Sequence, residues 1–345
     1  MNKQRETWVD AIKVLACILV VLGQLFQSMV KANILDSTAT YTWFYRTIQY
    51  FHMPLLFLCC GYLYQQGKPV KTTDDWLANI TKKLVTIGVP FLVFAGGNWL
   101  LKFAFSEETQ IDSLLLDLVI QPVTPYWVLY TLILIFLVTP TMYNKISAIA
   151  LAGVALGAKA VSVTMGNVGI YAVDTLLGNW LWFVLGMVLA FVKAPKVLRK
   201  QKGIRRLGLV LLVAFFVGSI AVVMRSVSHS ILSFMFGVFG CSAILVLAVT
   251  MKYTDQSRGV ILWLSDYSLP VLLMNGIFAR ILRNVLLNAG ITNAILHIAA
   301  GIVVSFGCPI LVGFVMKKLK WPEFILYPDQ FVKFRSSREK TKKSE

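Results

Sequence analysis

The chain has 345 residues, of which 57% are hydrophobic and only 14% are charged. A soluble domain carries about a quarter charged residues, so this composition excludes an ordinary soluble globular protein. The formal net charge of +17 would suggest a nucleic-acid partner in a soluble protein. Here, however, the basic residues gather in alternate loops, as orientation signals of membrane proteins do. We therefore expect no binding to nucleic acid.

Apolar runs of membrane-spanning length recur along almost the whole chain. A run of about 20 apolar residues crosses a hydrocarbon core about 30 Å thick. In chain order the expected spans cover residues 8–30, 44–66, 82–104, 126–143, 146–164, 170–192, 207–224, 230–251, 260–283 and 291–316. The sequence therefore predicts an all-α polytopic protein of about ten transmembrane helices, located in the cell membrane as a multi-pass protein.

The loops between these spans alternate in charge. Lysine and arginine are concentrated before the first span, after the second, sixth and eighth spans, and after the tenth. The loop between the third and fourth spans is acidic instead, with Glu107, Glu108, Asp112 and Asp117. Because positively charged loops stay in the cytoplasm, both termini are predicted to be cytoplasmic.

One domain is the economical interpretation. We expect a transmembrane domain over residues 1–318 and a basic tail over residues 319–345. The tail should lie along the membrane surface, attracted by anionic lipid, or be disordered. No cleavage site follows the first span, so no cleavable signal peptide is expected. The five cysteines lie inside spans, without metal-ligand or disulfide spacing, and we interpret them as small buried apolar residues. No metal site is expected.

Polar side chains occur inside several spans, where they are costly and usually face the bundle interior or a wet cavity. The first span holds Asp10, Lys13 and Gln24. Lys13 and Gln24 are eleven residues apart, which places them on one face of a helix, about 16 Å apart along its axis. Asp10 lies one turn from Lys13 and can pair with it. Taken alone, this pair could also be an interfacial ion pair whose lysine reaches the cytoplasm.

Polar residues of the first span and of three other spans are expected at similar depths in the membrane. The helix rise places Gln24, His52 and Asn275 about 9–12 Å below the outer surface, with Asp174 slightly higher. Because each group needs a polar partner in hydrocarbon, a common cavity in the outer half of the membrane is the simpler explanation. His52 alone could equally be a histidine that only hydrogen-bonds between helices. For His229, in an outer loop, and His297, on the last span, such a structural role is favoured.

Several segments, in collinear order along the chain, resemble those of one protein family. They are WVDAIKVLACILVVLGQ (8–24), YFHMPLLFLCCGYLY (50–64), KKLVTIGVPF (82–91), TPYWVLYTLIL (124–134), NWLWFVLGMVLA (179–190) and YSLPVLLMNGIFARIL (267–282). They resemble the acyltransferase 3 family of integral membrane acyltransferases. In that family a basic residue, ten intervening residues and a histidine mark the first helix, and an aromatic-His-Met-Pro run marks the second.

The resemblance implies a ten-helix fold and O-acyl transfer, usually of acetyl, from a donor such as acetyl-CoA on the cytoplasmic side. It implies acceptor hydroxyls on surface polysaccharide, peptidoglycan or lipid-linked sugars. A cavity histidine would act as general base, with Asp10, Lys13 and Trp127 shaping the site. The CoA phosphates would find candidate partners in Lys82, Lys83, Lys193, Lys196 and Arg199. These cations could equally be orientation signals.

The sequence departs from the family pattern at the expected base. Gln24 stands where the family has its histidine, and Asn275 stands where relatives often carry one. Cys59 and Cys60 precede Gly61 where serine is usual. An amide cannot accept a proton near neutral pH. Three outcomes are open: His52 is the working base, the activity is weak, or the chain is a non-catalytic descendant that binds acyl-CoA, lipid or glycan. A glycan or lipid transporter is a further alternative, which predicts an internal structural repeat.

Overall fold

The computed structural model describes residues 5–67, 70, 72–105, 120, 122, 126–225, 230–320 and 322–332. Three features predicted from the sequence lie outside these residues. They are the acidic loop with Glu107, Glu108, Asp112 and Asp117, the loop residue His229, and the basic tail from residue 333 onward.

Within the described residues every regular element is helical, which confirms the predicted all-α class. In chain order the elements are α1 (Thr7–Lys31), α2 (Ala39–Gln49), α3 (His52–Gln65), α4 (Thr73–Phe105), α6 (Trp127–Val138), α7 (Lys145–Met165), α8 (Tyr171–Phe191), α9 (Ala194–Lys200), α10 (Ile204–Met224), α11 (Ser230–Thr250), α12 (Asp255–Asn288), α13 (Ala294–Leu319), α14 (Glu323–Leu326) and the 3₁₀ helix η2 (Pro328–Gln330). In this part of the chain 8 helices are long and apolar enough to cross a membrane, and α6 is a shorter apolar helix. The count of about ten and the cytoplasmic placement of both termini stay predictions.

The span predicted over residues 44–66 is wrong as a single helix, because α2 ends at Gln49 and α3 begins at His52. The backbone of Phe51 leaves the helical region, with φ −131° and ψ −25°. Pro54 supplies the physical reason, since it has no N–H to donate to the carbonyl of Tyr50. In the first turn of α3 this missing N–H costs little, because the first N–H groups of any helix lack intrahelical partners. The break thus favours a helix that starts with His52.

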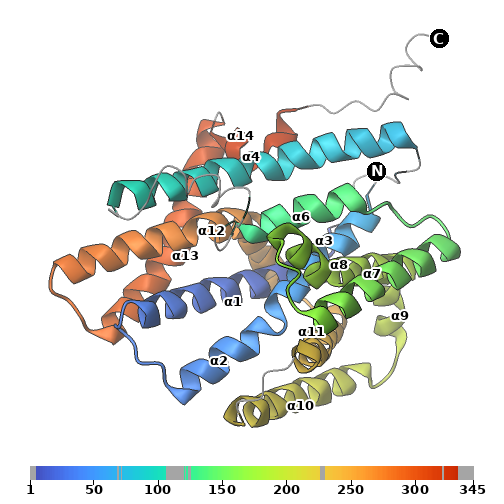
Figure 1. The fold of residues 1–345 in the computed structure, drawn as a ribbon, viewed down its shortest axis with the longest axis horizontal. Helices are drawn as coiled ribbons and strands as arrows, with labels where there is room; N and C mark the ends of the chain where they lie inside the picture. Colours follow the sequence, from blue (N-terminus) through green and yellow to red (C-terminus); the bar gives the residue numbers. More distant parts are fainter. Residues whose placement is uncertain are drawn as a thin grey trace.

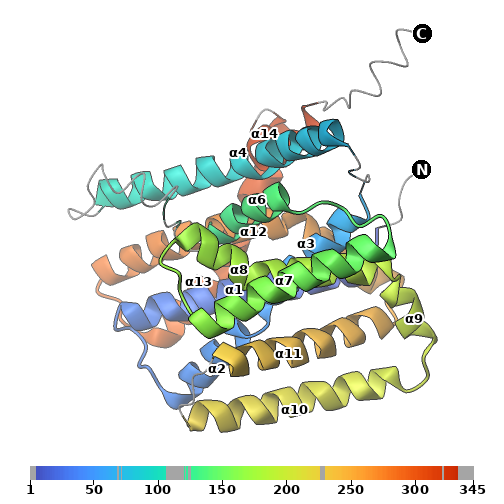
Figure 2. The same cartoon turned by 45° about the vertical axis from the view of Figure 1, so that its right-hand side comes forward.

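Glycine allows α3 and α8 to cross at a very short distance. An added Cβ at Gly61 would lie 1.9 Å from the carbonyl oxygen of Phe183, and one at Gly186 would lie 2.0 Å from that of Leu58. Small residues permit such close approach between membrane helices. On its other sides α3 packs against α1, which also packs along α12. Figures 1 and 2 show α1 inside the bundle, with α4 along one edge and α10 along the opposite edge.

The outward faces of the bundle are apolar. Large apolar side chains such as Ile149 on α7, Val213 on α10 and Val303 on α13 are exposed, at 73%, 62% and 69%. An apolar surface of this extent would be unstable in water but suits contact with lipid tails. The surface therefore supports a multi-pass membrane protein.

The segment after α13 returns to the bundle. In both cartoon views α14 lies beside α4 (Figures 1 and 2), and α14 and η2 both contact α4. Leu326 is only 1% exposed and joins a core cluster with Phe91 of α4 and Leu273 of α12. Residues 322–332 therefore differ from the expected disordered or surface-lying tail, because their apolar side chains anchor them to the helices.

Candidate active site

A polar cavity of about 170 Å³ lies between α1, α2, α3 and α6. We call it the amide cavity. Its polar and aromatic lining consists of Gln24, Gln27, Tyr45, Gln49, His52 and Trp127. Gln49, the last residue of α2, and His52, the first of α3, both line it. The structure thus brings Gln24, His52 and Trp127, from three different helices, to one cavity.

His52 is oriented by its own chain. The side chain is 5% exposed, and its Nδ1 bonds to the carbonyl oxygen of Ile48, in the last turn of α2. A carbonyl oxygen only accepts, so Nδ1 must carry the proton and donate it. The neutral imidazole then has its lone pair on Nε2. This tautomer is the one that a general base acting through Nε2 requires.

Gln24 can act as a hydrogen-bond donor, whereas the Nε2 of His52 can act as an acceptor. Its Nε2 is buried and has no hydrogen-bond partner among the described residues. A buried amide N–H without a partner is costly, and such a group calls for a ligand or a water molecule. Because an amide nitrogen donates and does not accept, Gln24 can present N–H groups to a substrate oxygen but cannot take its proton.

Two other residues predicted for this layer do not line the amide cavity. Asn275 is 1% exposed, and its Nδ2 donates to the carbonyl oxygens of Val271 and Leu272 on its own helix, at 2.8 and 3.0 Å. Asp174 lies in the first turn of α8, where its carboxylate accepts from the backbone N–H of Val168 and of Gly169. Both side chains therefore satisfy local backbone groups.

A second and larger cavity, of about 500 Å³, lies between α1, α3, α6, α12, α13 and η2. We call it the lysine cavity, since Lys13 and Lys317 both line it. Beside it, Asp10 accepts from Nε of Arg5 at 2.9 Å and from Nζ of Lys13 at 3.5 Å. The hydroxyl of Ser265 donates to the same carboxylate at 2.6 Å. The predicted pair of Asp10 and Lys13 is thus present, as part of a wider network.

The remaining cations that the sequence suggested for the CoA phosphates do not line the lysine cavity. Lys82, Lys193 and Lys196 are exposed. Lys83 is partly buried, with Nζ 4.7 Å from the ring centroid of Phe136. Arg199 donates from Nε to the carbonyl oxygen of Val249 at 3.1 Å, which ties α9 to the end of α11. A direct role of these five residues in holding a donor stays a prediction.

A family model of the acyltransferase domain, acyltransferase 3, matches residues 6–314. The chain belongs to the acyltransferase 3 family. Family membership implies a membrane acyltransferase, and it confirms the resemblance found in the sequence. No curated protein and no solved structure matches the chain significantly. The matched region of this acyltransferase 3 protein ends within α13, so α14 and η2 lie beyond it.

Three residues near the C-terminus line the lysine cavity of this acyltransferase 3 protein but were not predicted from the sequence as site residues. They are Lys317, Tyr327 and Gln330. The available signal was the apolar run from Phe324 to Tyr327, flanked by Pro322 and Pro328 in an otherwise polar tail. A short apolar run of this kind indicates a packed segment rather than a solvated one.

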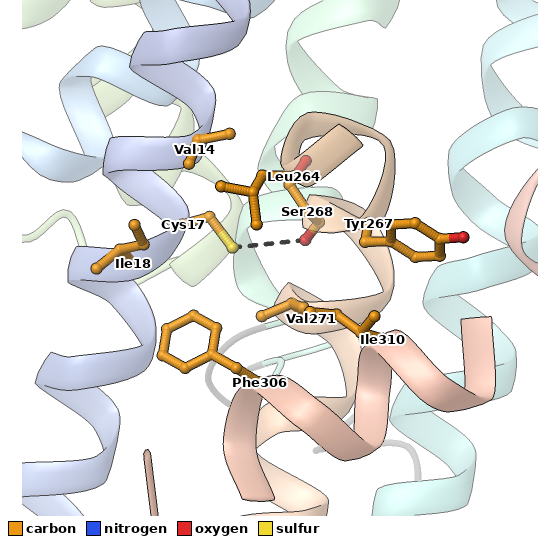
Figure 3. Close-up of a pocket in the computed structure, with 9 residues that line it drawn as sticks. All are labelled: Val14, Cys17, Ile18, Leu264, Tyr267, Ser268, Val271, Phe306 and Ile310. Atoms are coloured by element: carbon orange, nitrogen blue, oxygen red, sulfur yellow. Dashed lines mark hydrogen bonds between the residues drawn. The ribbon is translucent and has the colours of Figure 1, made fainter. Parts of the chain in front are cut away.

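A third cavity, of about 270 Å³, lies between α1, α12 and α13 (Figure 3). In Figure 3 Cys17 of α1 points toward Ser268 of α12, and its Sγ donates to the carbonyl oxygen of that residue at 3.6 Å. Phe306 and Ile310 of α13 close the other side. The described lining is largely apolar and contains no histidine or carboxylate, so it suits hydrocarbon and not the acid–base chemistry of an acyltransferase.

Proposed function

We propose that the chain transfers an acyl group, acetyl, from acetyl-CoA to a hydroxyl of a cell-envelope glycan or of a lipid-linked sugar. The observation that carries this proposal is the convergence of His52, Gln24 and Trp127 on the amide cavity, next to the lysine cavity along α3 and α6. We further propose that the protein resides in the cell membrane with both termini in the cytoplasm. The lysine cavity would then face the donor and the amide cavity the acceptor.

The proposed reaction needs one base and one oxyanion donor. His52 Nε2 removes the proton of the acceptor hydroxyl as its oxygen attacks the thioester carbonyl. The carbonyl π electrons move onto oxygen to give a tetrahedral intermediate. Collapse of this intermediate breaks the C–S bond, and the departing thiolate takes the proton from the imidazolium. The products are an ester of the acceptor and free CoA, with His52 returned to its neutral form.

Gln24 supplies the second element of this mechanism. Gln24 lines the same cavity as His52, and its buried Nε2 has no hydrogen-bond partner among the described residues. Amide N–H groups that point to a developing oxyanion lower the barrier to acyl transfer, typically by about 3–4 kcal/mol for one donor. Under this proposal the chain keeps a base in His52 and uses the family's histidine position for hydrogen-bond donation.

A second candidate is a non-catalytic protein that binds acyl-CoA, lipid or glycan. Gln24 favours it, because the amide cannot replace the imidazole as a base. Loss of a general base typically lowers a rate by about 10²–10⁴-fold. Binding without turnover is the behaviour that this candidate predicts.

Radiolabelled acetyl-CoA given to membranes that contain the protein, followed by glycan and lipid extraction, tests both candidates. We expect label in the extract with the wild type, less label with Gln24→His, because this substitution removes the amide donor of the proposed mechanism, and none with His52→Ala. More label with Gln24→His would show instead that position 24 serves better as a base than as a donor. His297→Ala is the matched control, because His297 is also a buried histidine but lies on α13, where it bonds to the carbonyl oxygen of Ile291. Binding of acetyl-CoA without transfer in any variant would favour the non-catalytic candidate. The absence of both binding and transfer would exclude the acyltransferase and an acyl-CoA-binding protein, and would leave only binding of lipid or glycan.

A further inference from the structure

Lys317, near the end of α13, faces the lysine cavity as a cation without an acidic partner. Its Nζ lies 4.6 Å from the ring centroid of Tyr267 and 5.6 Å from that of Tyr327. Among the described residues no carboxylate lies within ion-pair distance of it. Aromatic faces attract an ammonium group but do not cancel its charge. A positive charge is therefore available to a ligand on this side of the cavity.

Lys13 of α1 is a second cation in the lining of the same cavity. Lys13 Nζ reaches Asp10 only at 3.5 Å, whereas Arg5 binds that carboxylate at 2.9 Å and Asp266 at 2.7 Å. Arg5 thus engages both nearby carboxylates. Lys13 consequently keeps donor capacity, and the two lysines give the cavity an excess of positive charge.

The C-terminal segment supplies part of the cavity wall. The hydroxyl of Tyr327 donates to the carbonyl oxygen of Asp266 at 2.7 Å, and the buried Leu326 holds the preceding turn against α4 and α12. Burial, with the nearby charge of Asp266, raises the pKa of the Tyr327 phenol, so it stays a neutral donor. Gln330 of η2 completes this wall. The rest of the lining combines apolar side chains, including Phe57, Leu132 and Leu272, with the polar residues Ser265, Ser268 and Asp266. The carboxylate of Asp266 is paired with Arg5 at 2.7 Å.

We propose that Lys317, together with Lys13, binds the phosphate-bearing end of the acyl donor, and that Tyr327 and Gln330 of the C-terminal segment shape this site. The apolar lining takes the uncharged arm of the donor. Lysine is a suitable phosphate ligand as a compact point charge. The site includes residues beyond the end of the family match at residue 314. Only the identity of the ligand as an acyl-CoA rests on the function proposed above.

Calorimetric titration of the purified full-length protein in detergent with CoA itself tests the site. We expect Lys317→Gln to weaken CoA binding roughly tenfold, as the loss of one charge-assisted contact does. Lys318→Gln is the matched control, because it removes the same charge from the next residue, which is exposed and does not line the cavity. Tyr327→Phe keeps the ring and removes only the hydroxyl, so it should bind CoA more weakly than wild type while unfolding at a similar temperature.

Pantetheine, which lacks the phosphates of CoA, separates a charge contact from a general loss of structure. Its binding should be the same in the wild type and in Lys317→Gln. Equal CoA affinity in Lys317→Gln and Lys318→Gln would overturn the inference while leaving acetyl transfer intact. CoA binding that depends on Lys317 in a protein that transfers no acetyl group would support the inference and contradict the proposed turnover. A wild-type protein that binds no CoA would refute the inference outright.

Discussion

A methyl group at Gly61 would collide with backbone rather than with a flexible side chain. Its Cβ would lie 1.9 Å from the carbonyl oxygen of Phe183, whereas real contacts of this kind essentially never fall below 3.0 Å. In Gly61→Ala the helices α3 and α8 must therefore separate by about 1 Å, because a packed interior has no free volume to absorb the methyl group. Overpacking typically costs about 1–3 kcal/mol. We expect the upper end of this range, since the obstacle is a carbonyl group held in a helix.

The same separation affects the proposed site, because α3 begins with His52. A misplacement of about 1 Å in a reacting group can lower a rate about 100-fold. We expect Gly61→Ala to unfold at a lower temperature in detergent and to lose acetyl transfer to this extent. Gly157→Ala on α7 is the control. A Cβ there meets nothing within 4 Å, and alanine should stabilise the helix by up to about 1 kcal/mol. Equal unfolding temperatures and transfer rates in Gly61→Ala and wild type would refute this explanation of the crossing.

Three further predictions concern charged side chains. Burial favours the neutral form of Glu6, but hydrogen bonds from groups including Tyr62 outweigh it and lower the pKa of Glu6 below its ordinary value of 4.5. The stability from ionised Glu6 is therefore present above pH 4.5 and is lost as the pH falls through the lowered pKa. On acidification, the unfolding temperature of the wild type should consequently fall more than that of Glu6→Gln. Asp174→Ala removes two hydrogen bonds from the loop before α8, worth about 1 kcal/mol each, and should leave acetyl transfer unchanged, whereas a large loss of transfer would place this carboxylate in the site. Asp10→Asn leaves Arg5 without its buried partner. It should lower the free energy of unfolding, measured by chemical denaturation, by about 1–3 kcal/mol and not more, because Arg5 itself is partly solvated. An unchanged free energy of unfolding would show that the network contributes nothing to stability.

Hydropathy could predict where most helices lie but not how far they extend. The spans expected over residues 82–104 and 260–283 are α4 (Thr73–Phe105) and α12 (Asp255–Asn288). Hydropathy reports the apolar stretch that matches the hydrocarbon core. Backbone hydrogen bonding continues into polar turns beyond it, such as the start of α4 at Thr73 and Asp74. The break before His52 was recoverable from Pro54, because a proline near a helix start is a local signal.

The position of a residue along its helix predicted only part of the site. It gives the depth of a side chain in the membrane but not the neighbouring helix toward which that side chain points. Gln24 and His52 line one cavity as their depths predict, whereas Asn275 and Asp174, at similar depths, do not line it. Asn275 has the expected side-chain type, but its amide turns to the carbonyls of its own helix. The contribution of Tyr327 could not follow from span counting, because it depends on how a segment after the last span packs.

The two cavities of the proposed site meet along α3 and α6. His52 lines the amide cavity and Leu56 the lysine cavity, one helical turn or about 6 Å apart. On α6, Trp127 lines the amide cavity and its neighbour Val128 the lysine cavity. The ring of Phe57 contacts that of Trp127, with centroids 6.2 Å apart. These two aromatic side chains therefore form part of the partition between the spaces.

This partition bears on which acyl group the proposed reaction can use. An apolar partition opposes the passage of phosphate charge, because transfer of an ion into such surroundings carries a large desolvation cost. The charged part of the donor consequently stays among the lysines, and only the uncharged thioester end can reach His52. A small acyl group needs only a modest displacement of the rings of Phe57 and Trp127. A long acyl chain would have to fill the amide cavity of about 170 Å³, which the acceptor hydroxyl must also enter. Under the proposed reaction we therefore expect acetyl to be used in preference to long-chain donors.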